Sequence, residues 1–242
     1  MKIIKLNAID STNSFLKDLV RNSFVENFTT VVTENQKNGK GQMHTSWQSE
    51  PFKNLTFSTL ISKVNLKITE SKYINYAVSL AVYEALKEYT TPNLSIKWPN
   101  DIMSDDKKVC GILIENTFHS KRIKHCIVGI GLNVNQENFE NLPNAASLKN
   151  LLGKNFSIEE ILKLILEKLY ENFKILNANK FNQLEKDYLQ ALYKKGLVSN
   201  FKDKEGNLFS GIICGISTNG YLQIKLNDNS LKEFGIKEIT FC

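Results

Sequence analysis

The sequence predicts an α+β fold: a mixed β-sheet with flanking helices, followed by a small C-terminal SH3-like β-barrel. Two observations support this prediction. Up to about residue 194, β-rich stretches are interspersed with stretches in which apolar residues recur at helical spacing. After Gly196 only short β segments remain, separated by turn residues, as in small barrels. We therefore expect two domains, residues 1–195 and 196–242.

Apolar spacing and capping residues predict the helices. Helices are expected from about residue 12 to 20 and over residues 69–89, 161–173 and 181–193. Asp10 or Ser11 supplies a side-chain acceptor at the start of the first helix. Ser157 and Glu160 form a capping box ahead of the third helix.

β-branched and alternating apolar residues predict the strands. Before the C-terminal barrel, strands are expected over residues 29–33, 55–61, 95–98 and 102–103, and over 109–118 and 122–134, which form a hairpin. The barrel strands are expected over residues 198–201, 208–216, 221–226 and 231–234. Residues 34–54 are polar and lack a period, which predicts a long loop, and such loops are usually functional or disordered.

Composition excludes several classes of protein. The chain has 242 residues, of which 42% are hydrophobic and 23% are charged, which argues against a disordered, collagenous or disulfide-stapled protein. The four cysteines form no CxxC pair and the three histidines have no metal-ligand spacing with them, which argues against structural zinc. No apolar segment approaches the length of a membrane span, so we expect a reduced, cytoplasmic protein.

The net charge of +6 is concentrated in two segments. Residues 35–63 carry +3 and residues 97–124 carry +2, whereas the barrel region carries only +1. Arg21 and Arg122 are the two arginines, and no basic stripe follows a predicted helix. We therefore expect no nucleic-acid partner.

Three local patterns could carry chemistry. In the first, Gly39 and Gly41 flank Lys40, an arrangement in which backbone N–H groups and an ammonium can approach an anion. A mobile solvent-facing turn is the alternative, and the pattern alone favours it.

The second pattern is a strand that ends in Lys97-Trp-Pro-Asn100-Asp101, with Lys108 on the returning strand. Lysines and a carboxylate in this arrangement suit a nucleoside triphosphate with magnesium, which Asp101 would hold. A hairpin turn with solvated lysines is the alternative. The third pattern, Gly129-Ile-Gly131-Leu-Asn133, permits either close approach of a ligand to a strand or tight strand packing.

Together, and in this order, these patterns resemble the biotin-protein ligases. The resemblance covers about residues 5–136 and includes Asp10-Ser-Thr-Asn13 and Gln36. Its most specific part is KWPND followed by K-x-x-GIL-x-E, and the family also has a C-terminal barrel. The resemblance implies a class II synthetase-like fold and a biotin-[acetyl-CoA-carboxylase] ligase. Such an enzyme joins biotin to ATP and passes the biotinyl group to a lysine of a biotin carboxyl carrier domain.

The resemblance also implies roles for individual residues. The biotin contacts would be Ser11, Thr12, Asn13, Gln36, Gly39, Lys40, Gly41, Gln42, Lys108, Gly111 and Gly129. The ATP and adenylate contacts would be Lys40, Trp47, Lys97, Asn100, Lys108, Gly131 and Asn133. Lys108, Lys40 and Asp101 would be catalytic, with Lys108 between the biotin carboxylate and the α-phosphate and Asp101 as the magnesium ligand.

The sequence departs from the family pattern at several positions of the glycine loop, including Gln42 and Met43, near which the family commonly has basic residues. Lys40 stands where the family more often has arginine, and lysine cannot make the planar two-pronged phosphate contact. His44 stands where the family commonly has glycine, and we assign it no role. Only about ten residues precede Ser11, so we expect no N-terminal DNA-binding domain of the kind that many relatives carry.

Two other functions are considered. A lipoate ligase or octanoyltransferase has a related core, but KWPND and the GKGQ loop argue against it. A non-catalytic basic module that binds nucleic acid through the barrel is the second alternative, and the low charge of that region argues against it. The sequence leaves open whether the protein is a monomer or a homodimer.

Overall fold

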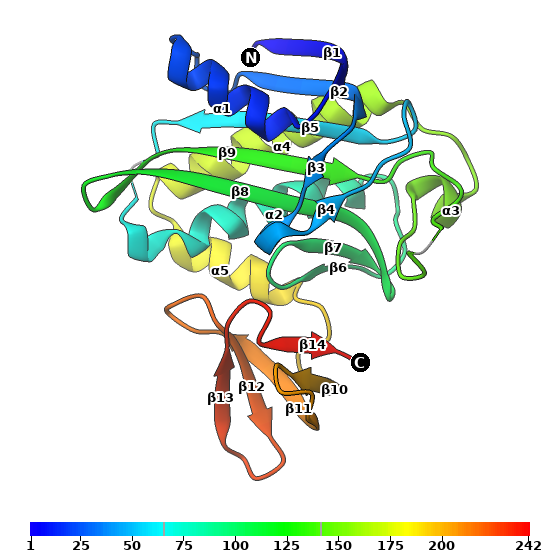
Figure 1. Ribbon diagram of the computed structural model, residues 1–242. Coiled ribbons are helices and arrows are strands. Elements are labelled where there is room, and N and C mark those ends of the chain that lie inside the picture. The colour runs from blue at the N-terminus through cyan, green and yellow to red at the C-terminus, as the bar shows by residue number, and fades with distance from the viewer. Residues whose placement is uncertain (65, 141) are drawn as a thin grey trace.

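A seven-stranded mixed sheet forms the centre of the protein. The computed structural model describes residues 1–64, 66–140 and 142–242, except for the side chain of His44. In spatial order the strands are β1 (Ile3–Ile9), β2 (Thr30–Gln36), β5 (Leu55–Ser62), β9 (Arg122–Leu132), β8 (Lys107–His119), β7 (Asp101–Ser104) and β6 (Leu94–Lys97). β1 runs parallel to β2, and every other neighbouring pair is antiparallel. The predicted hairpin of β8 and β9 is therefore confirmed (Figure 1).

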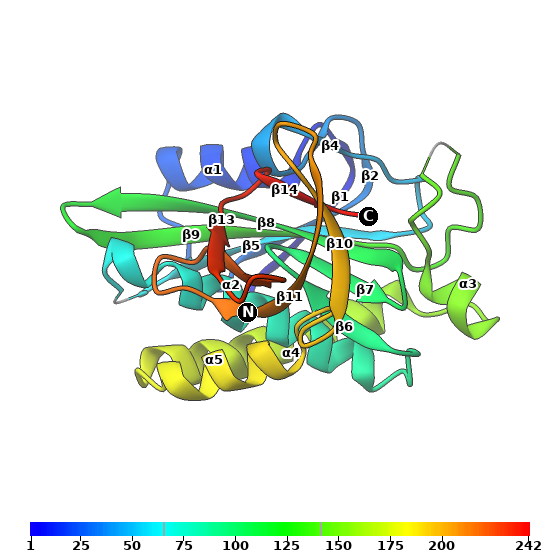
Figure 2. The same ribbon diagram turned by 90° about the horizontal axis from the view of Figure 1, so that it is seen from below.

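Helices cover both faces of this sheet (Figure 2). One face carries α1 (Thr12–Asn22), and the other carries α2 (Lys72–Lys87), against which α4 (Ile158–Asn177) and α5 (Phe181–Gln190) pack. The short elements are α3 (Leu148–Leu152) and the 3-10 turns Gln42–His44 and Ile68–Glu70. Ser11 and Ser157 cap their helices by accepting hydrogen bonds from the backbone N–H groups of Ser14 and Glu160, and in the described residues only this half of the predicted capping box at Ser157 is present.

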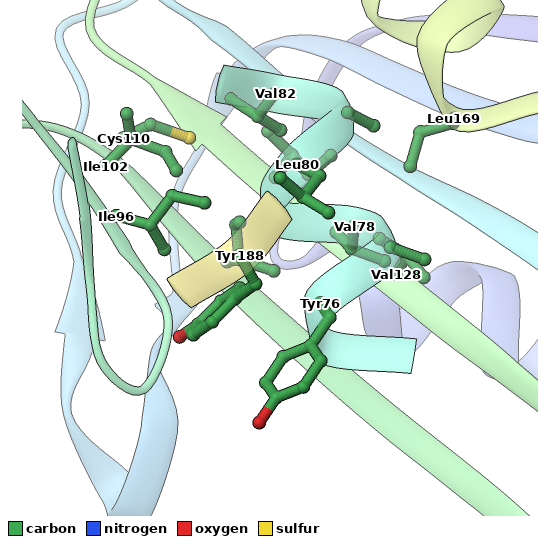
Figure 3. Close-up of a cluster of buried hydrophobic side chains, with 14 of the residues drawn as sticks. Tyr76, Val78, Leu80, Val82, Ile96, Ile102, Cys110, Val128, Leu169 and Tyr188 are labelled. Atoms are coloured by element: carbon green, nitrogen blue, oxygen red, sulfur yellow. The ribbon is translucent and has the colours of Figure 1, made fainter. Parts of the chain in front are cut away.

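A single core joins the sheet to the helices behind it. α2 is buried along most of its length because it lies between the sheet and the other two long helices (Figure 3). Tyr76 of α2 stacks on Tyr188 of α5 with their ring centroids 4.2 Å apart. On the opposite face, Leu16 of α1 packs with Leu60 and Ile127 in a smaller apolar cluster. Both faces of the central strands are thus buried. The glycines and polar residues on the α1 face are therefore unusual, because buried strands are usually apolar.

The C-terminal residues form a second, smaller sheet. Its strands, in spatial order, are β13 (Leu231–Phe234), β12 (Leu222–Leu226), β11 (Leu208–Ile216), β10 (Val198–Asp203) and β14 (Ile239–Phe241). The sheet is open, because β13 and β14 form its two edges and share no ladder in the described residues, so the predicted closed barrel is not confirmed. Phe201 and Ile213 nevertheless belong to the main hydrophobic core, which therefore continues between the two sheets.

Two sequence expectations need correction. β1 has no counterpart in the predicted strands, and the expected loop 34–54 contains the end of β2 and a short ladder of β3 (Gly39–Lys40) with β4 (Ser46–Trp47). β3 and β4 lack apolar alternation and become strands by pairing with each other, a tertiary contact that period alone does not reveal. β1 does alternate, because Ile4, Leu6 and Ala8 are separated by polar residues, so its sequence contains the pattern of a strand.

The concentration of charge also needs correction. The net positive charge of residues 97–124 does not gather at one place, because Lys121, Arg122 and Lys124 lie at the turn between β8 and β9. This turn is at the far end of the hairpin (Figure 1). Lys63 follows the end of β5 and likewise lines neither of the cavities described below. The two ends of the hairpin lie far apart. Charged residues that are close together in the sequence are therefore far apart in the structure.

Candidate functional site

A cavity of about 550 Å³ lies on the face of the large sheet that carries α1. Its walls come from β2, β5, β8 and β9, the start of α1, the loop 39–47, the turn 99–101 and the C-terminal residues 236–240. The predicted site residues that line it are Ser11, Thr12, Asn13, Gln36, Lys40, Gly41, Gln42, Trp47, Asn100, Asp101, Lys108, Gly111, Gly129 and Gly131. Segments separated by more than 200 residues therefore meet in one cavity.

One end of the cavity is polar and buried. Thr12 donates hydrogen bonds to the Gln36 side-chain oxygen from its backbone nitrogen, at 2.9 Å, and from its hydroxyl, at 3.2 Å. Ser11 and Thr12 are each only 3% exposed, because the helix that Ser11 caps begins against the middle of the sheet. Buried polar groups of this kind can recognise a polar ligand head by hydrogen bonds.

Asn13 is held beside this polar end from three sides. The Ser58 hydroxyl of β5 lies 2.5 Å from Asn13 Oδ1, and Asn13 Nδ2 donates to Glu115 at 2.9 Å. A Cβ atom on Gly129 would lie 2.3 Å from Asn13 Oδ1, so this glycine makes room for the amide. Gly129 is therefore closely packed against the start of α1, and not only against a neighbouring strand, within the cavity wall itself.

Glu115 anchors this arrangement from β8. Burial raises the pKa of its carboxyl, but hydrogen bonds from Lys17 and Asn13 outweigh burial and leave the pKa below the ordinary value. Its ion pair with Lys17 is 2.5 Å long. Glu115 is thus ionised at neutral pH and fixes the orientation of the Asn13 amide.

Trp47 forms the wall opposite the strands. Cβ atoms on Gly131 and Gly111 would lie 2.3 Å and 3.1 Å from its indole ring, so both glycines allow the ring to lie flat against the sheet. The Lys108 ammonium is 5.8 Å from the centre of the same ring. Trp47 is therefore an aromatic surface beside the central lysine.

An irregularity in β8 directs Lys108 into the cavity. The ladder with β7 pairs Lys108 with Met103 and Cys110 with Ile102, which leaves Val109 as an extra residue. Val109 and Cys110 are both buried in the main core, so the bulge breaks the alternation and sends Lys108 to the opposite face. Bulges next to active sites often re-aim a side chain in this way.

Asp101 pairs with the central lysine. Its carboxylate oxygen lies 2.7 Å from the Lys108 ammonium, whose side chain is about one third exposed. Asn100 is held beside them, because its amide nitrogen donates to the Ile112 carbonyl at 2.6 Å. The Lys108 ammonium, the Asp101 carboxylate and the Asn100 amide thus lie together in the wall of the first cavity. The second sequence pattern placed these groups close together.

Lys40 reaches toward α1 from the glycine loop. Its ammonium donates to the Ser14 hydroxyl at 2.9 Å, on an exposed side chain. Gly41 allows the loop to close on itself, because a Cβ atom there would lie 2.4 Å from the Thr45 hydroxyl. Gly39 does not line the cavity, and a Cβ atom there would lie 2.3 Å from the Trp47 carbonyl. The two glycines therefore shape the loop around Lys40.

A second cavity of about 560 Å³ adjoins the first and shares Trp47, Asp101 and Lys108 with it. Lys97 and Asn133 line this second cavity and not the first, which separates them from most predicted contacts. Its remaining walls include Tyr193, Lys194 and Phe241 from later in the chain. The pair of cavities could hold a ligand of two parts joined near Lys108.

Two residues of the second cavity have well-defined partners. Burial lowers the pKa of the Lys97 ammonium, which lies 4.6 Å from the centre of the Phe241 ring. Asn133 is 3% exposed, and its amide nitrogen donates to the Ala146 carbonyl at 3.1 Å. Asn133 thus holds the chain at residue 146 as well as facing the cavity.

Sequence reasoning missed several residues of the site. Ser58 and Glu115 support Asn13, and Ile236, Lys237 and Thr240 reach the first cavity from the C-terminal sheet. The sequence does contain a pattern that could have predicted Glu115, because residues 111, 113 and 115 of one strand share a face. No such pattern predicts the C-terminal residues, since their approach to the cavity depends on how the two sheets pack.

No group of three or more His, Cys, Asp or Glu side chains in residues 1–64, 66–140 and 142–242 could together hold a metal ion. In the same ranges no helix is long and apolar enough to cross a membrane. The side chain of His44 lies outside the described residues.

Comparison with known proteins gives consistent matches. The sequence profile described as "Biotin/lipoate A/B protein ligase family" matches residues 6–133. The bifunctional ligase/repressor BirA of Bacillus subtilis is 28% identical over 98% of this chain and 71% of its own length. The chloroplastic biotin-protein ligase 1 of Arabidopsis thaliana is 30% identical over 85% of this chain and 58% of its own length.

Solved structures are similar over the whole chain. The biotin protein ligase of Aquifex aeolicus, in complex with biotin and ATP, has a TM-score of 0.81 and 30% identity. The match covers 100% of this chain and 98% of that one. The biotin acetyl coenzyme A carboxylase synthetase of Helicobacter pylori has a TM-score of 0.58 at 19% identity, and this match supports the fold alone.

Proposed function

Because the chain belongs to the biotin/lipoate A/B protein ligase family, we propose that it is an ATP-dependent biotin-protein ligase. In the first step, a biotin carboxylate oxygen attacks the α-phosphorus of ATP, and the bond to the departing pyrophosphate breaks. In the second, a carrier lysine amine attacks the acyl carbon, AMP leaves with the bonding electrons, and the attacking nitrogen loses a proton. A mixed anhydride with AMP makes the acyl carbon reactive, because phosphate is a good leaving group.

One observation carries the proposal: a buried polar end and the Lys108–Asp101 pair line the same cavity. Ser11, Thr12 and Gln36 would bind the biotin ureido ring, whose N–H and C=O groups need buried hydrogen-bond partners. Lys108 would lie between the biotin carboxylate and the α-phosphate and stabilise the charge that develops during attack. The shared wall of the two cavities supports this placement of the reacting atoms.

The nucleotide would occupy the second cavity. Lys97 offers a cation for phosphate oxygens, and Asn100 and Asn133 offer amides nearby. Lys40 would contribute from the glycine loop, as a point charge in place of the planar fork of arginine. The proposal also divides the chain into residues 1–195, which supply most of the walls of both cavities, and residues 196–242, whose last residues complete those walls.

The site offers few carboxylates for a magnesium ion. Among the described residues, Asp101, beside Asn100, lines both cavities, and Asp106 lines the second cavity. Magnesium at nucleotide sites is usually held by one or two carboxylates together with substrate phosphates. Asp101 and Asn100 are the residues that would meet the ion. When bound, magnesium would neutralise phosphate charge, while Lys108 would keep its own contact with the reacting groups.

The acceptor would be a biotin carboxyl carrier domain, and the finer proposal is a biotin-[acetyl-CoA-carboxylase] ligase. A ligase from Paracoccus denitrificans that bears this name is 31% identical over 43% of this chain. Because the reaction consumes ATP, the proposal places the enzyme in the cytoplasm. It is compatible with either a monomer or a homodimer.

A lipoate ligase is disfavoured by the same cavity. The dithiolane ring of lipoate has no N–H or C=O group, so it would leave the buried Ser11, Thr12 and Gln36 groups without ligand partners. Incubation with ATP, magnesium, an apo carrier domain and either biotin or lipoate tests the choice. We expect biotinylated carrier and no lipoylated carrier, and the absence of both biotinyl-adenylate and labelled carrier would reject the proposed function.

A further inference from the structure

The turn between β13 and β14 places a lysine where glycine is usual. The backbone N–H of Glu238 donates to the Gly235 carbonyl at 3.1 Å, and Lys237 is the third residue of this four-residue turn. Lys237 has φ of +66°, the left-handed conformation that this turn position requires and that L-residues with a Cβ disfavour. The turn itself therefore gives no reason for a lysine.

The contacts of the Lys237 side chain give a reason for a lysine at this position. Its ammonium donates to the Met43 carbonyl at 2.6 Å, joining the C-terminal sheet to the tip of the loop 39–47. Lys237 also lines the first cavity, together with Ile236 and Ile239. A residue held in a disfavoured conformation at a site is a reason to look for a functional constraint.

The loop tip is itself held in an unusual conformation. Met43 has φ of +49°, inside the short turn that follows Gly41. The base of the loop is fixed by the two-residue ladder in which Gly39 pairs with Trp47. The Lys237 contact meets the opposite end, so the loop is supported at its base by its own ladder and at its tip by the C-terminal sheet.

We propose that Lys237 is a positioning residue that latches the glycine loop over the first cavity. This inference rests on the proposed function for its consequence. A latched loop would keep Lys40 near the reacting groups and slow both the entry of water and the escape of the acyl-adenylate. The C-terminal sheet would thereby act on the first half-reaction through one side chain.

Hydrogen exchange of the loop amides tests the latch directly, on the full chain without ligand. Lys237→Met removes the charge and keeps the disfavoured backbone, whereas Lys237→Gly removes both. We expect amides 40–45 to exchange about three- to ten-fold faster in both variants, as expected for loss of one charge-assisted hydrogen bond. Lys237→Arg, which keeps a donor, should exchange nearly as the wild type does.

Lys63→Gly is the matched control. Lys63 is exposed, has the same φ of +66°, and lines neither cavity, so its substitution by glycine relieves the same backbone conformation without touching the loop. We expect unchanged exchange of amides 40–45 in this variant. Wild-type exchange in both Lys237→Met and Lys237→Gly would overturn the latch, and so would equal acceleration in Lys63→Gly.

The second readout is the rate at which preformed biotinyl-adenylate leaves the enzyme. We expect release to be several-fold faster in Lys237→Met and Lys237→Gly, with Lys237→Arg close to the wild type. Unchanged release with faster loop exchange would reject the catalytic consequence of the latch. If the wild-type chain forms no adenylate, the proposed function fails, whereas the exchange experiment still decides whether Lys237 holds the loop.

Discussion

The two ends of the site are built in opposite ways. At the polar end, Thr12 and Asn13 are buried and bonded to residues of the central strands. At the nucleotide end, Lys97 and Lys108 are partly exposed and face walls that come from later parts of the chain. The first end is preformed by the sheet, whereas the second is assembled from several loops and from the C-terminal sheet.

This difference suggests a division of labour. A rigid polar end suits recognition of a small, neutral ligand head, because preorganised hydrogen bonds need no reordering on binding. Charged side chains at an open end suit a polyphosphate, which brings its own counterions and must leave after reaction. Four substitutions test whether the two ends act independently.

The largest effect is expected at the junction of the two ends. Lys108→Ala should lower the rate of adenylate formation by at least about 100-fold, because it removes a cation aimed at the developing charge. Pyrophosphate exchange measures this step. Lys124→Ala is the control, since Lys124 is exposed near the far end of the β8–β9 hairpin and lines neither cavity. Full activity of Lys108→Ala would remove Lys108 from the mechanism.

At the polar end, Gly129→Ala should weaken biotin binding by roughly ten-fold or more. The new methyl group would lie 2.3 Å from Asn13 Oδ1, and overpacking of this kind costs about 1–3 kcal/mol. Titration calorimetry measures the affinity. Gly215→Ala is the control, because its nearest neighbour would be 3.8 Å away. Equal biotin affinity in both variants would show that Asn13 can move without consequence.

At the nucleotide end, Lys97→Met should raise the KM for ATP by about five- to ten-fold and leave biotin affinity unchanged. The expected size reflects the loss of one charge-assisted contact. Lys87→Met is the control, since Lys87 also lies over an aromatic ring, Tyr83, but on α2 away from both cavities. A loss of biotin affinity in Lys97→Met would contradict the separation of the two ends.

The smallest effect is expected from the support behind Asn13. The pKa of Glu115 is lowered in the folded protein, so its charge stabilises the fold at neutral pH. That stabilisation is lost as the pH falls from the ordinary glutamate pKa of about 4.3 through the lower folded value. Glu115→Gln should therefore lower the free energy of unfolding at pH 7 by about 1 kcal/mol.

Denaturant unfolding of this variant at pH 7 and near pH 3 measures the dependence. The difference from the wild type should shrink at acid pH, because a protonated glutamate and a glutamine are both neutral. Glu137→Gln, which breaks the exposed pair with Lys149, should leave stability nearly unchanged at both pH values. A difference that is constant with pH would mean that Glu115 acts through its shape and not its charge.

Local signals predicted much of the fold. The Ser11 cap, the long apolar period of α2 and the β8–β9 hairpin depend on residues near one another in sequence, and each forms as expected. The β3–β4 ladder was missed because two-residue polar strands exist only through their partners, whereas β1 carried an alternating apolar signal that was overlooked. The open C-terminal sheet differs from the expected barrel because, in the described part of the chain, β14 pairs with β10 and not with β13, a non-local pairing that the sequence does not reveal.

The sequence by itself determined which chemical groups are available: a glycine loop with one lysine, a lysine–asparagine–aspartate strand end, and a Ser-Thr-Asn helix start. Only the tertiary structure decided how they combine. A bulge turned Lys108 into the cavity, Gly129 and Gly131 admitted Asn13 and Trp47, and sheet packing brought Lys237 to the loop. The physical reason is that local periodicity governs which segments fold as helix or strand, whereas non-local packing governs which side chains meet.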